Sequence, residues 1–463
     1  RPSHRAAGHD GETIVNRSIA CALMTLALVS TAPAAASAAK IERAVTPGGI
    51  EFWHVHDNTL PMLSMEFAFE GGAAQDPADK PGVANLMASL LDEGAGDLDA
   101  RAFQERLEER AIVMSFTAQR DSLRGSLKTL TEHQDHAFDL LRLALTQPRF
   151  DAEAVERVRA ATLAGLRRRT TNPSDIAGER WFARAFPDHP YGRPARGTLE
   201  SVARISIDDL RTMHRNVAAR SNLKIATVGA VDSARAAALI DRAFGALPAQ
   251  AVLSPVPETV PQGAGEHDIV DMDVPQTVIT FGSAGLKRSD PDFIPAFVLN
   301  HILGGGSFSS RLYREVREKR GLAYSVYSYL APLDRAGLFI GGVSTRNDRA
   351  AESLAIIVEE IRRIAEEGPT EEELAKTKSY LIGSYPLRFD TSGKIAAQLL
   401  EIQLENLGID YIDRRNGLIE AVTAEDVRRA AARFLADAKL LVTLVGRPDP
   451  VPPPPVSASA RRG

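Results

Sequence analysis

The chain is organised around residues 304–328, which read GGGSFSSRLYREVREKRGLAYSVYS. Three glycines lead into Ser309 and Ser310, and serine is among the residues preferred at the N-cap of a helix. The charged residues that follow predict a helix that runs to Arg320. Gly321 stands where the C-terminus of a helix favours a left-handed residue. The stretch therefore predicts a glycine turn, a charged helix and a sharp stop.

The residues after this helix predict a strand. Ala323 to Leu330 is rich in Tyr, Val and Ser, and Pro332 is expected to end it. Arg317 then lies in the last helical turn, and Tyr324 lies at the start of the strand. Each side chain can then reach toward the same point outside the turn.

The glycine run admits more than one interpretation. A glycine-rich turn before a helix can bind phosphate through free backbone N–H groups. No Gly-Lys-Ser/Thr follows here, which argues against a nucleotide loop. A charged helix is also typical of a plain solvated surface.

The same stretch resembles the C-terminal half of zinc peptidases of the pitrilysin and mitochondrial-processing-peptidase family (inverzincins). In that family a glycine-rich segment, a Ser-Arg-Leu triplet and an Arg-(six residues)-Tyr pair mark the substrate side of the active site. The pair falls on Arg317 and Tyr324 of this sequence. The resemblance implies four further substrate contacts, at Gly304, Gly305, Gly306 and Ser307.

Composition sets the broad class. The chain has 463 residues, of which 44% are hydrophobic and 25% charged, and its formal net charge is −5. This is an ordinary globular composition with room for two or more domains. The mild acidity gives no reason to expect nucleic acid or an anionic membrane as a partner.

Residues 17–38 read as a secretory signal. Arg17 is followed by an apolar run over residues 18–31, which is too short to span a membrane, and residues 36–38 (Ala-Ser-Ala) form a small-x-small cleavage site. The alternative is an uncleaved anchor. Cys21, the only cysteine, lies inside this signal, so the mature chain suits an oxidising compartment. We expect a periplasmic protein with no membrane span after cleavage.

Residues 82–94 occupy the place where the family carries His-x-x-Glu-His on a helix. There two histidines hold zinc and the glutamate is the general base. This chain has Asn85, Ala88 and Ser89 instead, and Val158 replaces the remaining glutamate ligand. Asn and Ser are poor zinc ligands, and Ala cannot accept a proton. We therefore expect no metal on this chain.

Five histidines are candidate metal ligands by residue type. His54 and His56 fall on one face of a strand but lack a third ligand, so surface positions are expected for both. His133 and His136 are spaced for one helix face, for which solvent exposure is the simpler interpretation. His189 lies in a Pro- and Gly-fixed loop and is expected to bond to the backbone.

Internal repetition predicts two related halves. Three pairs of segments resemble each other at a nearly constant spacing: residues 60–67 resemble 274–281, residues 151–155 resemble 370–374, and residues 206–210 resemble 423–427. The fold class predicted is α+β, with two homologous sheet-plus-helices domains in tandem that make up half of a clam-shell peptidase. The predicted boundaries are a signal segment (1–38), an N-terminal domain (39–246), a proline-rich linker (247–266), a C-terminal domain (267–446) and a disordered tail (447–463).

The resemblance also implies a function. In part of the family the shell is a pair of chains, one of which brings zinc while the other supplies the Arg/Tyr pair. We expect this chain to be the zinc-less subunit, with Tyr324 donating to the oxyanion, Arg317 holding the substrate carbonyl, zinc in a homologous partner chain, and peptides as substrates. The alternatives are a peptide-binding or scaffold protein with no peptidase partner, and a self-sufficient zinc peptidase with unrecognised ligands.

Overall fold

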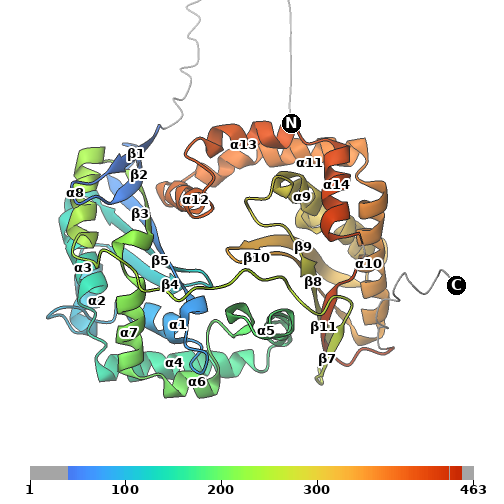
Figure 1. The fold of residues 1–463 in the computed structure, drawn as a ribbon, viewed down its shortest axis with the longest axis horizontal. Helices are drawn as coiled ribbons and strands as arrows, with labels where there is room; N and C mark the ends of the chain where they lie inside the picture. Colours follow the sequence, from blue (N-terminus) through green and yellow to red (C-terminus); the bar gives the residue numbers. More distant parts are fainter. Residues whose placement is uncertain (1–39, 437, 451–463) are drawn as a thin grey trace, which may run out of the picture. The chain divides into compact units, whose positions relative to one another are not determined.

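Two mixed β-sheets, each packed against helices, make up the fold (Figure 1). The computed structural model describes residues 40–436 and 438–450. The signal predicted at residues 17–38, its Cys21 and most of the predicted tail lie outside the described residues. No helix in the described ranges is long and apolar enough to cross a membrane.

The first sheet, called the N-terminal sheet below, has the strand order β1-β2-β6-β3-β5-β4. Strands β2 and β6 run parallel, and all other neighbours are antiparallel. The strands are β1 (Ile41–Val45), β2 (Glu51–His56), β3 (Met62–Glu70), β4 (Val113–Ala118), β5 (Ser122–Leu130) and β6 (Leu223–Gly229).

The second sheet, the C-terminal sheet, has the strand order β7-β11-β8-β10-β9. Strands β7 and β11 are its parallel pair, which matches the β2–β6 pair of the first sheet. The repeat predicted from the sequence is therefore confirmed at the level of strand order and direction. The strands are β7 (His267–Asp271), β8 (Gln276–Ala284), β9 (Ala323–Leu333), β10 (Ala336–Arg346) and β11 (Leu441–Gly446).

Fourteen α-helices complete the described part of the chain, and their starts follow local capping rules. Ser206, Thr370 and Thr423 each accept a backbone N–H and form a capping box, as their sequence positions predicted. The helices are α1 (Val83–Ala88), α2 (Ala100–Glu108), α3 (Gln134–Thr146), α4 (Ala152–Arg169), α5 (Pro173–Ala185), α6 (Leu199–Arg204), α7 (Ile207–Val217), α8 (Ser233–Phe244), α9 (Phe293–Asn300), α10 (Ala350–Glu367), α11 (Glu371–Gly383), α12 (Ser392–Leu404), α13 (Tyr411–Glu420) and α14 (Ala424–Phe434).

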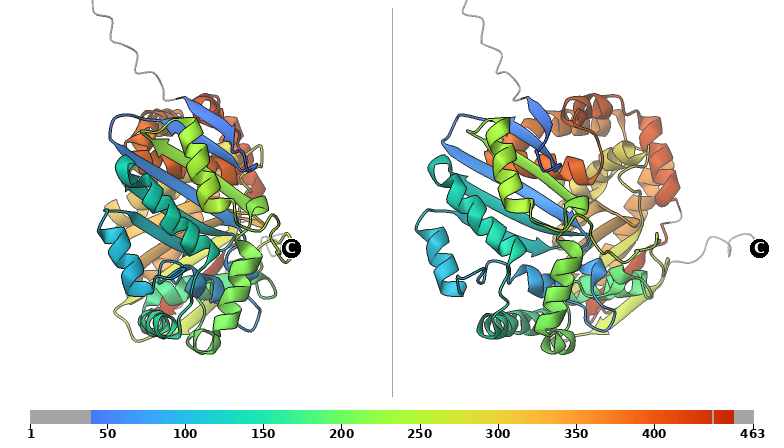
Figure 2. Two further views of the ribbon diagram at one scale, coloured as in Figure 1. Left: turned by 90° about the vertical axis from the view of Figure 1, so that its left-hand side faces the viewer. Right: turned by 60° about the vertical axis from the view of Figure 1, so that its left-hand side comes forward.

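The alternation in β3 explains why the N-terminal sheet has two apolar faces. Met65, Phe67 and Phe69 point into a core that they share with α3 and α8, which lie over the sheet in Figure 2. Phe67 is fully buried, and burying a phenylalanine side chain stabilises a fold by roughly 1.5–3 kcal/mol. Ala68, between them, points to the opposite face and joins a second cluster.

That second cluster is covered by a helix from the other half of the chain. Helix α12 packs its apolar side against Trp53 and Val55, and Gln403 donates a hydrogen bond to the carbonyl of Ile225 in β6 at 3.0 Å. Because the covering helix comes from the C-terminal half, the N-terminal sheet is buried on both faces only when both halves are present.

The C-terminal sheet is covered in the same way by a helix from the N-terminal half. Trp181 of α5 is fully buried against this sheet and donates to the carbonyl of Leu441 in β11 at 3.0 Å. Helix α5 begins at residue 173 and α12 at residue 392, a spacing equal to that between residues 151 and 370 in the sequence repeat. Each half therefore covers the sheet of the other half with the equivalent helix.

The predicted linker, residues 247–266, contains no helix or strand and is mostly exposed. Its backbone is nevertheless tied down. Ser254 exchanges hydrogen bonds with Gln75 at 2.7 and 3.1 Å, and the N–H of Thr259 donates to the carbonyl of Arg335. The segment therefore crosses between the halves in a defined path.

Candidate functional site

The structure brings the predicted Arg/Tyr pair together. Arg317 comes from a π-helical segment, η7 (Tyr313–Glu318), and Tyr324 from the start of β9, the edge strand of the C-terminal sheet. The guanidinium carbon of Arg317 lies 4.7 Å from the centre of the Tyr324 ring and 4.8 Å from that of Tyr313. Arg317 also donates to the Tyr313 hydroxyl. With 81% of its surface exposed, Tyr324 presents its ring to an incoming molecule.

The helix around Arg317 differs from the one predicted. The N–H of Lys319 bonds to the carbonyl of Arg314, five residues back, at 3.0 Å, so the turn is wider than an α-helical one. Such π-helical turns occur frequently at functional sites. The helical segment ends at Glu318, two residues before the predicted end, and Gly321 has the left-handed conformation predicted for it, at φ +60°. The strand runs to Leu333 and not to the predicted end, because a proline is tolerated on an edge strand.

Arg311 anchors this segment, a role that the sequence did not reveal. Its guanidinium binds both carboxylate oxygens of Glu373, at 2.9 and 2.7 Å, and the carbonyl of Gly368 at 3.0 Å. The Arg311 side chain is only 4% exposed. Burial alone would raise the pKa of Glu373, but the hydrogen bonds from Arg311 hold it at about 2. The Ser-Arg-Leu motif thus fastens the Arg317 segment to α11.

The glycine run has a packing role. A Cβ on Gly304 would lie 2.4 Å from Ser328 Oγ, and one on Gly306 would lie 2.6 Å from the carbonyl oxygen of His301. Gly304 is buried, whereas Gly305 and Ser307 are exposed. Ser307 has a φ of +48°, a conformation that non-glycine residues adopt at a cost of about 1–2 kcal/mol. Substrate contacts at these residues stay a prediction.

Three of the four positions where the family carries its zinc ligands and general base line one cavity. Asn85 of α1, Ser89 at the C-cap of that helix and Val158 of α4 line a single cavity of about 780 Å³. The fourth position, Ala88, is 1% exposed and faces the core. Helix α1 ends at Ala88, so the last motif position, Ser89, follows it directly.

Arginines dominate the rest of this cavity. Arg157 pairs with Glu93, and Arg169 pairs with Asp175 at 2.6 Å. Two further arginines line the cavity without a carboxylate partner in the described ranges: Arg168 and Arg196. Positive charge of this kind repels a divalent cation, and the motif positions offer no good ligand. The residues present therefore do not fit zinc, and in the described chain no group of three or more His, Cys, Asp or Glu is placed to hold a metal.

Two of the candidate histidines, His54 and His189, bond to other groups of the protein. The prediction of a surface position for His54 is wrong: it is fully buried, with its ring nitrogens bonded to Thr227 Oγ1 at 2.9 Å and to the carbonyl of Val231 at 3.0 Å. Its ring is covered because Thr227 of the neighbouring strand β6 and the backbone of Val231 lie against it. His189 bonds to the backbone as predicted, accepting from the Tyr191 N–H and contacting the carbonyl of Pro257.

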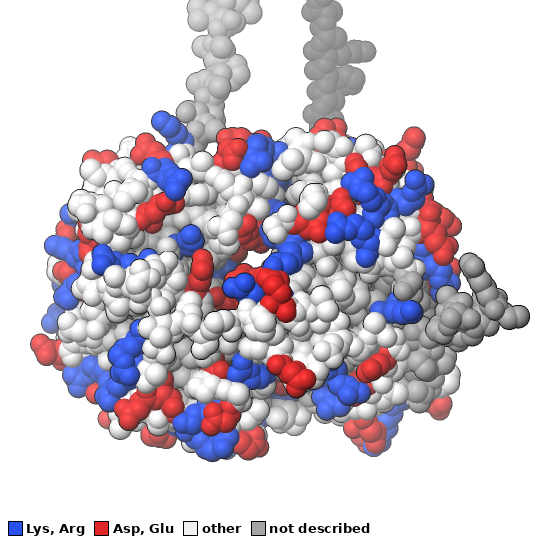
Figure 3. Space-filling model, viewed as in Figure 1, with Lys and Arg blue, Asp and Glu red and all other residues white. Residues whose placement is uncertain are grey.

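The charged surface has no dominant sign on the face shown in Figure 3. Lysine and arginine side chains are interspersed there with aspartate and glutamate. Two local features stand out: the half-buried Arg317 against the exposed Tyr324 on a sheet edge, and the arginine-lined cavity at Asn85, Ser89 and Val158.

Fold and site together define a peptidase-like protein whose metal positions carry other residues. The chain belongs to peptidase family M16. The family described as "Insulinase (Peptidase family M16)" matches residues 54–199, and the family described as "Peptidase M16 inactive domain" matches residues 204–381. These matches confirm the family and the fold class predicted from the sequence.

Similar proteins span most of the chain. A non-peptidase homolog, YmxG of Helicobacter pylori, is 30% identical over 72% of this chain and 77% of its own. An uncharacterized zinc protease of Streptomyces coelicolor is 28% identical over 88% of this chain and 89% of its own. The crystal structure of a peptidase M16 inactive domain from Pseudomonas fluorescens superposes with a TM-score of 0.84 at 28% identity, covering 90% of this chain and 99% of that one.

Proposed function

We propose that this chain is the zinc-less subunit of a heteromeric M16 metalloendopeptidase. The observation that carries the proposal is the contact between the half-buried Arg317 and the exposed Tyr324 on the edge of the C-terminal sheet. The arginine-lined cavity at the former metal position and the similarity to a non-peptidase homolog support it. In this proposal a homologous chain brings the zinc that activates water.

The two side chains act on the charge that develops in peptide hydrolysis. Attack on a peptide carbonyl creates an oxyanion, and Tyr324 donates its hydroxyl hydrogen to that oxygen. Arg317, held by Tyr313 and stacked on Tyr324, adds positive charge beside the same atom. Removing one such donor typically costs about 10²–10³ in rate.

Strand β9 provides a place for the peptide. As an edge strand, β9 pairs with only one neighbouring strand, β10, and an extended peptide can add to such an edge with little sequence preference. Tyr327 and Tyr329, half exposed on the same strand, offer ring faces to its side chains.

The test is peptide hydrolysis by this chain alone and mixed with a zinc-bearing M16 chain of the same genome. We expect no turnover alone and turnover in the mixture, with Arg317→Ala and Tyr324→Phe each lowering the rate at least tenfold. Lys319→Ala, an exposed cation of the same segment, is the matched control and keeps the rate. Unchanged rates in the first two variants contradict the assignment.

Other outcomes separate the alternatives. Chelator-sensitive hydrolysis by this chain alone identifies a self-sufficient peptidase. Peptide binding without hydrolysis in either sample identifies a peptide-binding or scaffold protein.

We also propose that the chain acts in the periplasm, on the basis of the signal pattern at residues 17–38. Fractionation of cells that carry the full-length chain tests this. Recovery in the cytoplasmic fraction contradicts it.

A further inference from the structure

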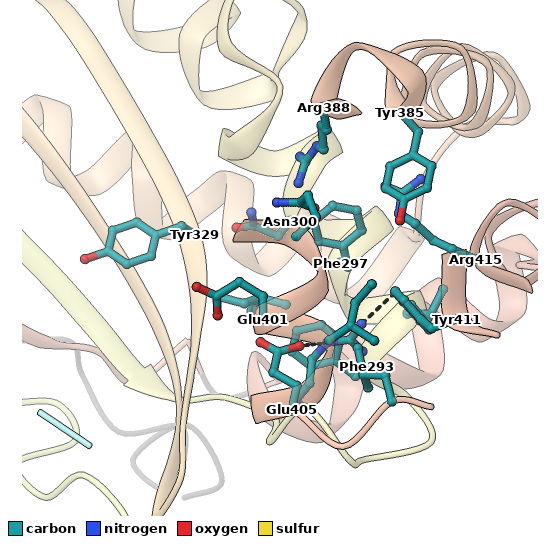
Figure 4. A pocket seen from close by; sticks show the side chains of 16 residues that line it. Phe293, Phe297, Asn300, Tyr329, Tyr385, Arg388, Glu401, Glu405, Tyr411 and Arg415 are labelled. Atoms are coloured by element: carbon teal, nitrogen blue, oxygen red, sulfur yellow. Dashed lines mark hydrogen bonds and ion pairs between the residues drawn. The ribbon is translucent and has the colours of Figure 1, made fainter. Parts of the chain in front are cut away.

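A second cavity, of about 360 Å³, lies between β9, α9, α12 and α13 (Figure 4). Its volume is at the small end of the range for ligand pockets, about 300–1,000 Å³, and suits a group of the size of one amino acid. Much of its wall is aromatic, and the rings come from five residues: Phe293, Phe297, Tyr329, Tyr385 and Tyr411.

A buried arginine in this wall lacks a counter-charge. Arg415 is 6% exposed, and its guanidinium donates to the carbonyl of Leu381 and to the side-chain oxygen of Asn416, both at 3.1 Å. Its guanidinium carbon lies 4.0 Å from the centre of the Tyr385 ring. No carboxylate pairs with it among residues 40–436 and 438–450. Because a buried charge is costly unless it is paired, this guanidinium is prepared for an anion.

A second arginine stands at the rim. Arg388 is exposed, and its side chain points from the η9 segment (Tyr385–Phe389) toward Asn300 in Figure 4. It makes no hydrogen bond or ion pair within the described residues.

The two acids of the cavity are already engaged. Glu405 accepts from Arg288 at 2.6 Å, and Glu401 pairs with Arg124 of the N-terminal half. Positive charge on Arg388 and Arg415 is therefore left without a partner inside the cavity.

Arg388 also has a counterpart in the N-terminal half. Arg169 lines the cavity at Asn85, Ser89 and Val158, and Arg388 follows it at the spacing that relates α4 to α11 and α5 to α12. In both halves an arginine at this position therefore lines a cavity.

We propose that this cavity binds a carboxylate attached to an apolar group, either the free C-terminal residue of a peptide or a small apolar carboxylic acid. The carboxylate pairs with Arg388 and Arg415, and the apolar group packs on Phe293 and Phe297. Charge-assisted pairs of this kind are the strong class of hydrogen bonds.

The binding claim stands without a peptidase partner, but its use in peptide handling rests on the proposed function. Tyr329 lies five residues after Tyr324 on β9, which is about 17 Å at 3.3 Å per residue. A peptide laid along β9 at Arg317 and Tyr324 would therefore reach the cavity with its terminus a few residues further on.

Isothermal titration of the purified chain tests the proposal. The probes are N-acetylphenylalanine, its amide, and a heptapeptide ending in phenylalanine with a free or an amidated terminus. We expect each acid to bind at least tenfold more tightly than its amide, and Arg388→Gln to remove that preference. Arg388 is exposed, so the variant is expected to fold. Arg414→Gln, an exposed neighbour of Arg415 that pairs with Asp410, keeps the preference.

Each result decides the proposal. Equal affinity for acid and amide, no binding at millimolar probe, or a preference that survives Arg388→Gln overturns it. Where the preference holds, tighter binding of the peptide acid than of N-acetylphenylalanine identifies a peptide terminus as the ligand, and equal binding identifies a small acid. No zinc-bearing chain is present, so a failure of the proposed peptidase function leaves this result unchanged.

Discussion

Breaking the contact between Arg311 and Glu373 should loosen the segment that carries Arg317. Two hydrogen bonds join the guanidinium to the carboxylate, and the two side chains are 4% and 18% exposed. Arg311→Met keeps much of the volume of the arginine side chain but leaves the Glu373 carboxylate without its main partner. Removing one member of a buried pair in this way typically costs about 3–5 kcal/mol.

The pKa of Glu373 gives a second measure, which combines the contact with Arg311 and the hydrogen bonds from the Thr370 backbone and Arg314. A pKa of about 2, against 4.5 for an exposed glutamate, corresponds to about 3 kcal/mol, and solvent screening reduces this to about 2–3 kcal/mol. Because the folded pKa is depressed, this stability is fully present above pH 4.5 and is lost as the pH falls toward 2. At pH 3 less than half of it should remain.

Urea unfolding of a double-mutant cycle, with Arg311→Met and Glu373→Gln, measures the coupling free energy at pH 7 and pH 3. We expect about 2–3 kcal/mol at pH 7 and less than half of that at pH 3. The exposed pair of Arg349 and Glu352 serves as the control, with an expected coupling of about 0.2–0.5 kcal/mol. A coupling below about 0.5 kcal/mol at pH 7, or one that does not change with pH, would refute this account.

Three further predictions concern a buried glutamate, two glycines and the positions of the family's zinc motif. Burial raises the pKa of Glu66 to about 7, so the free energy of unfolding falls as the pH rises from about 4.5 to 7. In urea unfolding, Glu66→Gln should raise the free energy of unfolding by about 1–2 kcal/mol at pH 8 and leave it unchanged at pH 4. An equal increase at both pH values would contradict this. Gly125→Ala places a Cβ 2.1 Å from the ring of Phe67 and should cost at least about 1–3 kcal/mol, whereas Gly178→Ala, with open space around it in α5, should stabilise by about 0.5–1 kcal/mol. Restoring the family's motif should create zinc binding, seen as a zinc-dependent stabilisation of about 2.7 kcal/mol at 100 times the Kd, which the parent chain should lack. The four substitutions are Asn85→His, Ala88→Glu, Ser89→His and Val158→Glu. No response to zinc would mean that these positions do not form a metal site in this backbone.

Features that depend on neighbouring residues could be predicted from the sequence. The alternation over residues 62–69 predicted β3, and the capping residues Ser206, Thr370 and Thr423 predicted three helix starts. These signals are local, since a strand face repeats every second residue and a cap bonds within one helical turn.

Features that depend on distant contacts could not be predicted. His54 is buried because Thr227 and Val231, far away along the chain, close over its ring. The sequence likewise did not distinguish a π-helical turn at Arg317 from an α-helical one, since both place charged residues on the surface. The cavity around Arg415 is built from segments between residues 288 and 415 that only the packed fold brings together.

Because each sheet is covered by a helix from the other half, the two sheets are covered at different times during synthesis. Strand β6 ends at residue 229, and helix α12 begins only at residue 392. At roughly 5–20 residues per second, a ribosome needs about 8–30 s to make the stretch between them. The face of the N-terminal sheet that carries Trp53 and Val55 must stay uncovered for this time. Helix α5, by contrast, has already been made when β8 and β11 emerge, so the C-terminal sheet meets its cover at once.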